Sequence, residues 1–216
     1  MGHFDNPYLK WLRNKKAERI CSALRGRAFD VELLNGVNDA LEKIIQIIPP
    51  NSTVAVGGSV TLEEMGLVEV LRKGPYRFYD RYQNLPFQKI VDIYRESVTA
   101  DYFITSVNAI TEAGELVCSD SSGNRVASLS FAAKKVIVVA GSNKLVKDID
   151  AAFERIKSIE PLNCLRNHHH TESSQTGFFV EEISDQRMMN VSCIVHYGGK
   201  FPGRIHVLVL KDEAGF

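Results

Sequence analysis

The stretch KKVIVVAG, residues 134–141, is the best candidate in the chain for a strand buried on both faces. It is short, apolar and rich in β-branched residues, and Gly141 ends it with a turn signal. Similar short runs lie outward from it, namely TVAV (53–56), YFITS (102–106) and RIHVLVL (204–210). Continuous apolar runs of this length are typical of strands inside a parallel sheet.

Helical spacing separates these runs. It appears within residues 61–73, 86–98 and 145–157, and a further helix is expected after Asn124. Strands that alternate with such helices predict an α/β fold, with a mainly parallel sheet covered by helices on both faces. The segment AITEAGELVCSD (109–120) predicts a hairpin that turns near Ala113 and Gly114, so part of the sheet is expected to be mixed.

Two further regions complete the expected organisation. Residues 1–50 contain two predicted helices, 7–25 and 37–48, before the first clear strand, and are expected to form an N-terminal helical arm packed on the core. Residues 51–216 then form the α/β domain. Within it, residues 161–190 lack sustained periodicity and are expected to be an irregular insertion. The runs at 191–197 and 204–210 predict two strands joined by a hairpin-type turn through GGKFPG.

Composition and charge exclude several classes of protein. The chain has 26 basic and 26 acidic side chains in 216 residues, so no global field favours nucleic acid or an anionic membrane. The N-terminal residues mix charges, and no run approaches the roughly 18 apolar residues of a membrane span. The four cysteines form no CxxC pair. We therefore expect a cytoplasmic protein with reduced thiols, bound to neither membrane nor nucleic acid.

The first candidate ligand loop follows the strand at 53–56. Ligands of open α/β sheets bind beyond the carboxyl ends of the strands. Glycine permits close backbone approach, and free amides at a helix start attract anions. The candidates here are Gly57, Gly58, Ser59 and Thr61. A tight turn with Ser59 or Thr61 as a helix cap explains the same residues equally well.

The second candidate loop follows the strand at 102–106. Asn108 could orient a ligand carbonyl or hydroxyl, and Thr111 lies close to it along the chain. Glu112 is the candidate catalytic base or nucleophile, provided that it is partly buried. The alternative is a solvated glutamate beside a hairpin glycine.

The third candidate site combines two loops that could each deliver a cation. An arginine and a lysine, together with backbone amides, would form an anion site. The alternative is that the asparagines cap helices and both cations face water. The candidates are Gly123, Asn124, Arg125, Gly141, Asn143 and Lys144. The three loops together predict a cleft for a small anionic metabolite.

A metal site is the weaker interpretation of the histidine run. His168, His169 and His170 lie between Cys164 and the later pair Cys193 and His196. Zinc and iron need ligands that converge, and adjacent histidines cannot all point inward from one segment without a special turn. A polar loop is the favoured reading. No metal and no cofactor are assigned.

Five motifs, in this order, resemble the LUD-domain family of lactate utilisation protein C, also called LutC/YkgG. They are GGSVTLEEMGL (57–67), TSVNAITEAGELV (105–117), GNRVA (123–127), VVAGSNKLV (138–146) and GRIHVLVL with AGF (203–216). The resemblance covers roughly residues 5–216. It implies a fold similar to the glucosamine-phosphate isomerase (NagB), ribose-phosphate isomerase (RpiA) and CoA-transferase group. It also implies a link to iron–sulfur partner proteins that oxidise L-lactate to pyruvate.

This sequence departs from the family in one segment. Many relatives resemble PC-x4-C-x2-C-x6-C shortly before the last two strands. Here the frame is kept by Thr176, Gly177, Ser184, Arg187 and Asn190, but Ser173 and Ser174 stand at the Pro-Cys pair, and the next three cysteine positions hold Phe179, Glu182 and Met189. A cluster that needs four thiolates cannot form from these side chains.

Three functions remain open. The first is a component of lactate oxidation that works with iron–sulfur partners and binds a small anion. The second is a stand-alone enzyme acting on a sugar phosphate, a small carboxylate or a CoA thioester. The third is a non-catalytic binding module for the same ligands. A homodimer is compatible with each of them, and whether the chain is an enzyme stays open.

Overall fold

The computed structural model describes residues 6–183 and 186–216. Ser184, part of the frame of the cysteine motif, and the first five residues of the expected arm lie outside the described residues. Within the described ranges, no helix combines the length and apolarity needed to cross a membrane.

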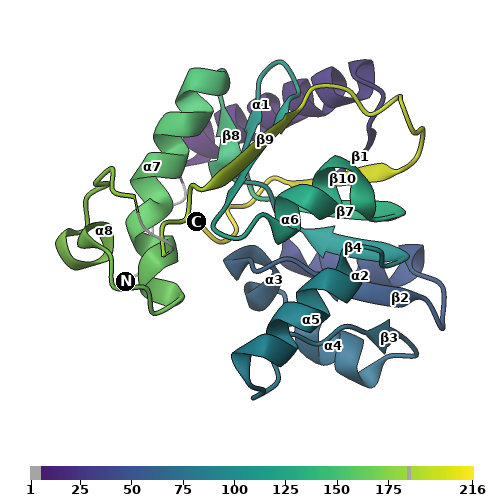
Figure 1. Cartoon of the computed structure of the whole chain (residues 1–216). Coiled ribbons are helices and arrows are strands. Elements are labelled where there is room, and N and C mark those ends of the chain that lie inside the picture. The colour runs from purple at the N-terminus through teal and green to yellow at the C-terminus, as the bar shows by residue number, and fades with distance from the viewer. Residues whose placement is uncertain (1–5, 184–185) are drawn as a thin grey trace.

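A six-stranded sheet forms the centre of the molecule, and all of its neighbouring strands are parallel (Figure 1). This confirms the predicted α/β fold with a mainly parallel sheet. In spatial order, the strands are β1 (Asp30–Leu34), β10 (Ile205–Leu210), β7 (Lys135–Ala140), β4 (Tyr102–Thr105), β2 (Thr53–Val56) and β3 (Arg77–Phe78).

Helices cover both faces of this sheet. Side chains alternate along β7, so Val136 and Val138 point to one core cluster and Ile137 and Val139 to the other. The first cluster contains α1 (Pro7–Gly26), α6 (Asn124–Ala127) and the π-helical turn η1 (Ser128–Ala132). The second contains α2 (Val37–Ile47), α3 (Val60–Glu64) and α4 (Leu67–Lys73). The remaining helix of this half, α5 (Phe87–Ser97), contacts β2.

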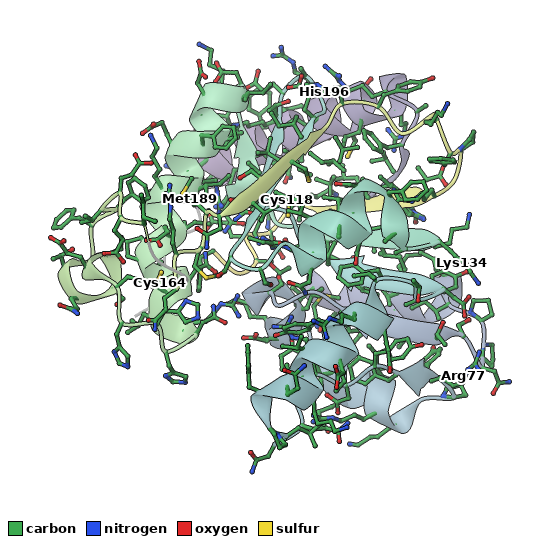
Figure 2. All side chains as sticks on the ribbon, viewed as in Figure 1. Arg77, Cys118, Lys134, Cys164, Met189 and His196 are labelled. Carbon is green, nitrogen blue, oxygen red and sulfur yellow. The ribbon has the colours of Figure 1, made fainter. Side chains whose placement is uncertain are left out.

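A second sheet, which contains the residue Cys118 labelled in Figure 2, lies between the first core cluster and a long helix. Its four strands are β8 (Leu145–Val146), β5 (Ala109–Thr111), β6 (Leu116–Asp120) and β9 (Val191–Val195), in that order. β5 and β6 form the predicted hairpin, and Gly114 supplies the positive φ of its turn. Ala109 and Val117 pack against α7 (Ile149–Arg166), which covers the outer face.

The expected N-terminal arm contains a strand that the sequence analysis did not foresee. The two helices lie where they were predicted, but β1 between them pairs with β10 at the edge of the main sheet. Its residues, DVELL, are at most half-buried. An edge strand of this kind lacks the continuous apolar run that identifies a buried strand. Residues 30–34 are therefore part of the main sheet rather than of a separate helical arm.

The predicted C-terminal hairpin is wrong. β9 pairs antiparallel with β6 in the second sheet, whereas β10 lies parallel to β1 and β7 in the first. The two strands are neighbours in sequence, but their partners are strands formed far earlier in the chain. Periodicity identifies a strand and carries no information about its partner.

The expected insertion at 161–190 is only partly irregular. The helix expected to end at residue 157 continues through Pro161 to Arg166, because α7 tolerates the loss of one backbone donor there. A short helix, α8 (Glu172–Thr176), follows, and Thr171 caps its start in a capping box with Ser174. Residues 177–183 and 186–190 are irregular.

Candidate functional site

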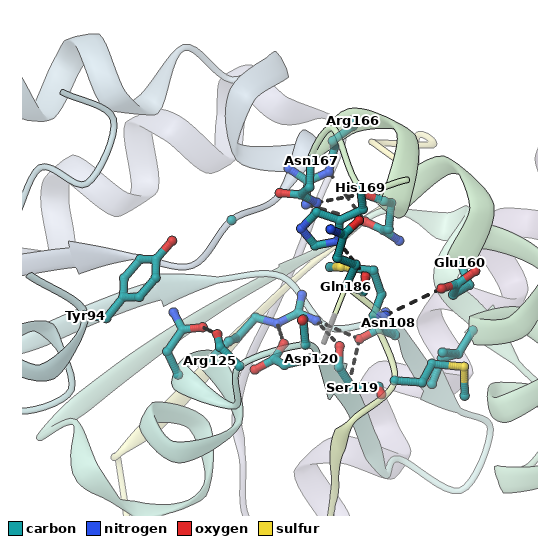
Figure 3. Close-up of a pocket in the computed structure, with 18 of the residues that line it drawn as sticks. Tyr94, Asn108, Ser119, Asp120, Arg125, Glu160, Arg166, Asn167, His169 and Gln186 are labelled. Carbon is teal, nitrogen blue, oxygen red and sulfur yellow. Dashed lines mark hydrogen bonds and ion pairs between the residues drawn. The ribbon is translucent and has the colours of Figure 1, made fainter. Parts of the chain in front are cut away.

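The main cavity, about 420 Å³ in volume, lies at the carboxyl edge of the parallel sheet (Figure 3). Loops that follow β2, β3 and β4 form one side of it, and β6, α6 and α7 form the other. A crevice beyond the carboxyl ends of parallel strands is where such folds bind ligands. Its wall includes Gly58, Arg81, Phe87, Tyr94, Asn108, Ser119, Asp120, Asn124, Arg125, Glu160, Asn163, Arg166, Asn167, His169, Gln186, Met188 and Met189.

Lys144 lies at a smaller inner cavity of about 20 Å³ that shares Gly58, Asn108, Arg125, Asn163 and Arg166 with the main cavity. It follows β7 through the 3-10 turn η2 (Ser142–Lys144), and only 3% of it is exposed. Its Nζ donates to Thr61 Oγ1 at 2.7 Å and to Ser106 Oγ at 2.9 Å.

The charge of Lys144 has no carboxylate partner within the part of the chain that the structure describes. Burial and, after it, the nearby guanidinium groups of Arg155 and Arg125 lower its pKa to about 7, although the charge of Glu64 opposes the shift. An ammonium in this position is stabilised by any anion that enters the inner cavity.

Arg125 lies in the side of the main cavity that β6, α6 and α7 form, and Asp120, Ser119 and Asn108 hold it there. Its Nε donates to Asp120 Oδ1 at 2.7 Å, and its Nη2 donates to the carbonyl of Ser119 at 2.7 Å and to Asn108 Oδ1 at 2.9 Å. Asp120 also accepts from the backbone amide of Val126 at 2.7 Å, which fixes the start of α6. Most donors of Arg125 are therefore occupied, and Asp120 balances its charge.

Arg81 supplies a third cation from the loop after β3. Its guanidinium carbon lies 4.8 Å from the ring centroid of Tyr94 and 5.2 Å from that of Tyr82. Among the described residues it forms no ion pair, so aromatic stacking positions it. A side chain at Gly58 would place its Cβ 2.7 Å from Arg81 Nη2, so the glycine permits the close approach of this arginine.

The end of α7 contributes the fourth cation. Arg166 contacts Glu63 Oε1 at 3.3 Å and Asn163 Oδ1 at 3.4 Å. Burial lowers the pKa of Arg166, and the charge of Glu63 opposes that shift. Because Glu63 is half-exposed, this pair is weak and leaves Arg166 available to a ligand.

Glu160 is a buried carboxylate in the wall formed by α7. It is 2% exposed, its Oε1 accepts from Cys164 Sγ at 2.9 Å, and its Oε2 has no hydrogen-bond partner within the described residues. Such a group is costly to bury unless a donor reaches it. A ligand hydroxyl or amine is one donor that could do so.

The cavity brings together many of the residues predicted from the sequence. Gly58, Asn108, Asn124 and Arg125 line the main cavity, and Ser59 and Lys144 line the inner one. Thr61 lies beside them because its hydroxyl accepts from Lys144. Gly57 lies one residue from the wall, where a Cβ would come within 2.8 Å of Thr105 Oγ1.

Glu112, the predicted base or nucleophile, lies outside both cavities. It follows β5 at the end opposite to Asn108 and forms an ion pair with Arg19 of α1 at 3.6 Å. Thr111, beside it, accepts from the backbone amide of Glu115 at 3.0 Å and donates to its carboxylate at 2.8 Å. Both residues therefore belong to the hairpin turn, and the geometry gives Glu112 no contact with a ligand in the cavity.

Three other predicted residues have structural positions. Asn143 donates from Nδ2 to the carbonyl of Gly215 and accepts from the amide of Ala214. A side chain on Gly141 would collide with the same C-terminal segment. Gly123 begins α6 with a φ of 81° and packs on Val191. These residues hold the loops in place rather than contact the cavity.

Sequence reasoning missed several residues of the wall. Arg81 follows the short strand β3, so the rule of carboxyl-end loops could have found it. Glu160 and Arg166 were missed because the helix was expected to end at residue 157, whereas α7 continues to Arg166. Asp120 lies at the last position of the predicted hairpin, and its partner Arg125 identifies it only in three dimensions.

The histidines and the altered residues of the cysteine motif do not converge. His169 Nδ1 lies 2.6 Å from the carbonyl of Gln186, and His196 Nδ1 lies 3.2 Å from Glu115. Ser173 is buried and bonds the backbone of Val180, while Phe179 lies beside Lys157. Within the described residues, no three histidine, cysteine or acidic side chains are grouped to hold a metal ion.

The parallel sheet and the residues at its carboxyl edge define an α/β protein with a polar cavity at that edge. The chain belongs to the LUD-domain family, because the model of the LUD domain matches residues 17–210. This family is implicated in lactate utilisation in general. No protein with a curated description matches the chain.

One solved structure has the same fold, and two others are less similar. A DUF162 family protein from Deinococcus radiodurans is 12% identical, with a TM-score of 0.54 over 92% of this chain and 98% of that one. The delta subunit of eIF2B from Chaetomium thermophilum is 16% identical, with a TM-score of 0.32 over 51% of this chain and 48% of that one. The beta subunit of the same assembly is 15% identical, with a TM-score of 0.34 over 68% and 59%.

Proposed function

We propose that this protein binds a small anionic metabolite in the main cavity, with the anionic group directed toward Lys144. The observation that carries the proposal is the ammonium of Lys144, which is 3% exposed, donates to two hydroxyls and forms no ion pair among the described residues. Arg166 lines both cavities, and Arg81 lines the main one. With Arg125, four cationic side chains line the two cavities against two carboxylates, Asp120 and Glu160, so the balance of charge favours an anion.

We further propose that the protein works in lactate utilisation together with iron–sulfur partner proteins. Membership of the LUD-domain family supports this role. Ser173 and Ser174 stand where many relatives carry the Pro-Cys pair, and Phe179, Glu182 and Met189 stand at the other three cysteine positions, so the partners would supply the electron transfer. A cytoplasmic location and a possible homodimer are part of the same proposal.

The size of the cavity favours one alternative ligand class. Cavities of 300–1,000 Å³ hold drug-sized ligands, and 420 Å³ leaves room beyond a three-carbon acid. A sugar phosphate or a CoA thioester would use the same cations and fill the space toward Phe87 and Tyr94. This alternative describes a stand-alone enzyme or a binding module.

Calorimetry with the purified full chain tests the binding proposal. L-lactate, pyruvate, ribose 5-phosphate and acetyl-CoA are titrated in turn. We expect at least one to bind and to raise the melting temperature. Lys144→Met should weaken that binding by roughly 10- to 100-fold, because a charge-assisted hydrogen bond is lost. Lys147→Met, in which an 84%-exposed lysine changes, is the matched control and should bind normally.

Equal affinity in Lys144→Met and in the unmodified protein would overturn the proposed site. The lactate role has a separate test, in which the gene is deleted and growth on L-lactate is measured. We expect growth to fail in the deletion strain, and iron–sulfur proteins to co-purify with the tagged chain. Normal growth without the gene would remove the lactate role and leave the binding result standing.

A further inference from the structure

Two of the four cysteines face each other across the second sheet. Cys118 on β6 pairs in register with Cys193 on β9, and the two strands are antiparallel. Directly opposed residues in such a ladder have Cα atoms roughly 4.5–5.5 Å apart and Cβ atoms at a similar spacing. Disulfides span Cα separations of about 4.4–6.8 Å. The Cα spacing of the ladder therefore already suits a bond between these sulfurs, and the Cβ atoms need to approach only to about 3.5–4.5 Å.

The two thiols differ in exposure and in acidity. Cys118 is fully buried, whereas Cys193 is partly exposed. A hydrogen bond from Cys118 lowers the pKa of Cys193 to about 7, although burial opposes the shift. The same hydrogen bond, together with burial, raises the pKa of Cys118 well above its usual value. An accessible thiol of low pKa beside a second thiol is the arrangement found in redox-sensing pairs.

The other two cysteines lack both features. Cys21 is buried in α1, and burial raises the pKa of its thiol to about 11. Cys164 is buried in α7, and burial together with its bond to Glu160 raises the pKa of its thiol to about 12. Neither lies opposite another cysteine in a strand ladder. Within this chain, the opposed pair is therefore the expected site of oxidation.

We propose that Cys118 and Cys193 form a reversible disulfide when the protein meets a peroxide. The Cys193 thiolate attacks the peroxide, becomes a sulfenic acid and releases hydroxide, which takes up a proton to give water. The sulfur of Cys118 then displaces the hydroxyl group from Cys193, and its proton leaves with that group as a second water. Hydrogen peroxide thus gains two electrons, and the two thiols lose two electrons and two protons.

The position of this bond links it to the wall of the main cavity. Cys118 directly precedes Ser119 and Asp120, which hold Arg125. Cys193 lies four residues after Met189, which lines the same wall. The disulfide would join these two parts of the wall covalently.

Thiol counting and peptide mapping test the proposal with the full-length protein. After treatment with hydrogen peroxide, we expect two of the four thiols to remain reactive in denaturant. A non-reduced digest should contain one cross-linked peptide pair carrying Cys118 and Cys193, lighter by two hydrogen atoms. Dithiothreitol should restore four thiols. Cys193→Ser should abolish the cross-link, and Cys21→Ser, a change at the buried thiol of α1, should retain it.

The proposal is overturned if all four thiols survive, if Cys193 advances to sulfinic acid without a cross-link, or if the cross-link involves Cys164. Cys118→Ser is a second test but changes a fully buried side chain. If that variant fails to fold, Cys193→Ser carries the test alone, because its side chain is partly exposed.

Discussion

Two regions of the site hold their cations in opposite ways. On the side of the main cavity built by β6 and α6, Arg125 is held by a carboxylate, a carbonyl and an amide oxygen. In the loops after β3 and β7, Arg81 of the main cavity is held by aromatic rings, and Lys144 of the inner cavity is held by hydroxyls. Figure 3 shows the first arrangement, with Arg125 between Asp120 and Asn108.

This difference distinguishes residues that stabilise the fold from residues that are expected to bind the ligand. A compensated buried ion pair fixes geometry, and breaking it is expensive. A buried cation without a counter-charge lowers the stability of the ligand-free protein. It also contributes the most binding free energy when an anion binds beside it. We therefore expect changes near Arg125 to alter folding first, and changes at Lys144 to alter ligand binding first.

Asp120→Asn has the largest expected effect. The variant leaves the buried guanidinium of Arg125 without its counter-charge and turns a donor toward either Arg125 or the amide of Val126. We expect the free energy of unfolding to fall by about 3–5 kcal/mol, measured by urea denaturation. Glu154→Gln, which breaks a mostly exposed pair with Lys157, is the control and should change stability by less than about 1 kcal/mol. If Asp120→Asn also lost less than about 1 kcal/mol, the ion pair of Asp120 with Arg125 would not stabilise the fold.

Lys144→Met has an intermediate and pH-dependent effect on stability. The pKa of Lys144 is about 7 in the folded protein and 10.5 in an ordinary environment, so between these values the unfolded chain binds a proton that the folded one lacks. Stability therefore rises with pH through this window, and the penalty is complete below pH 7. We expect Lys144→Met to be more stable than the unmodified protein near neutral pH, by on the order of a few kcal/mol.

Urea denaturation across that pH window measures the difference. The advantage of Lys144→Met should shrink as the pH rises, and Lys147→Met should follow the unmodified protein throughout. Parallel stability curves for Lys144→Met and the unmodified protein would show that the buried lysine carries no penalty.

Glu112→Gln has the smallest expected effect. Glu112 lies outside both cavities, and its partner Arg19 is largely exposed. We expect the affinity for any ligand identified by calorimetry to be unchanged, and stability to move by less than about 0.5 kcal/mol. Loss of ligand binding in Glu112→Gln would show that the hairpin turn belongs to the site and would contradict the placement of Glu112 outside it.

The sequence predicted the elements that neighbouring residues determine, and it did not predict the contacts between residues far apart in the chain. The helices 7–25 and 37–48 and the buried run 134–141 match α1, α2 and β7 within about two residues, a typical boundary uncertainty. Apolar spacing alone determines these elements. β1 was missed because its half-buried residues have no such spacing. The pairing of β9 and β10 was wrong because strand partners depend on contacts distant in sequence.

The site follows the same division. Loops after β2, β4 and β7 were predicted because parallel strands bring their carboxyl ends to one edge, and Lys144 and Asn108 lie there. Glu160 and Arg166 were missed because the apolar spacing was followed only to residue 157, whereas α7 continues to Arg166. Glu112 was placed in the cleft together with Asn108, although it lies at the turn of the predicted hairpin and β5 separates the two residues.

The place of β10 in the sheet bears on how the chain folds. Residues 205–210 insert between β1 and β7, so residue 30 near the start meets residue 206 near the end. Pairing over such a long loop slows folding. During synthesis, β1 and β7 remain unpaired on the edges that face β10 until residues 205–210 are available, and this edge of the apolar run 136–140 stays open. A chain stopped before residue 205 would thus present two adhesive edges and be prone to aggregate.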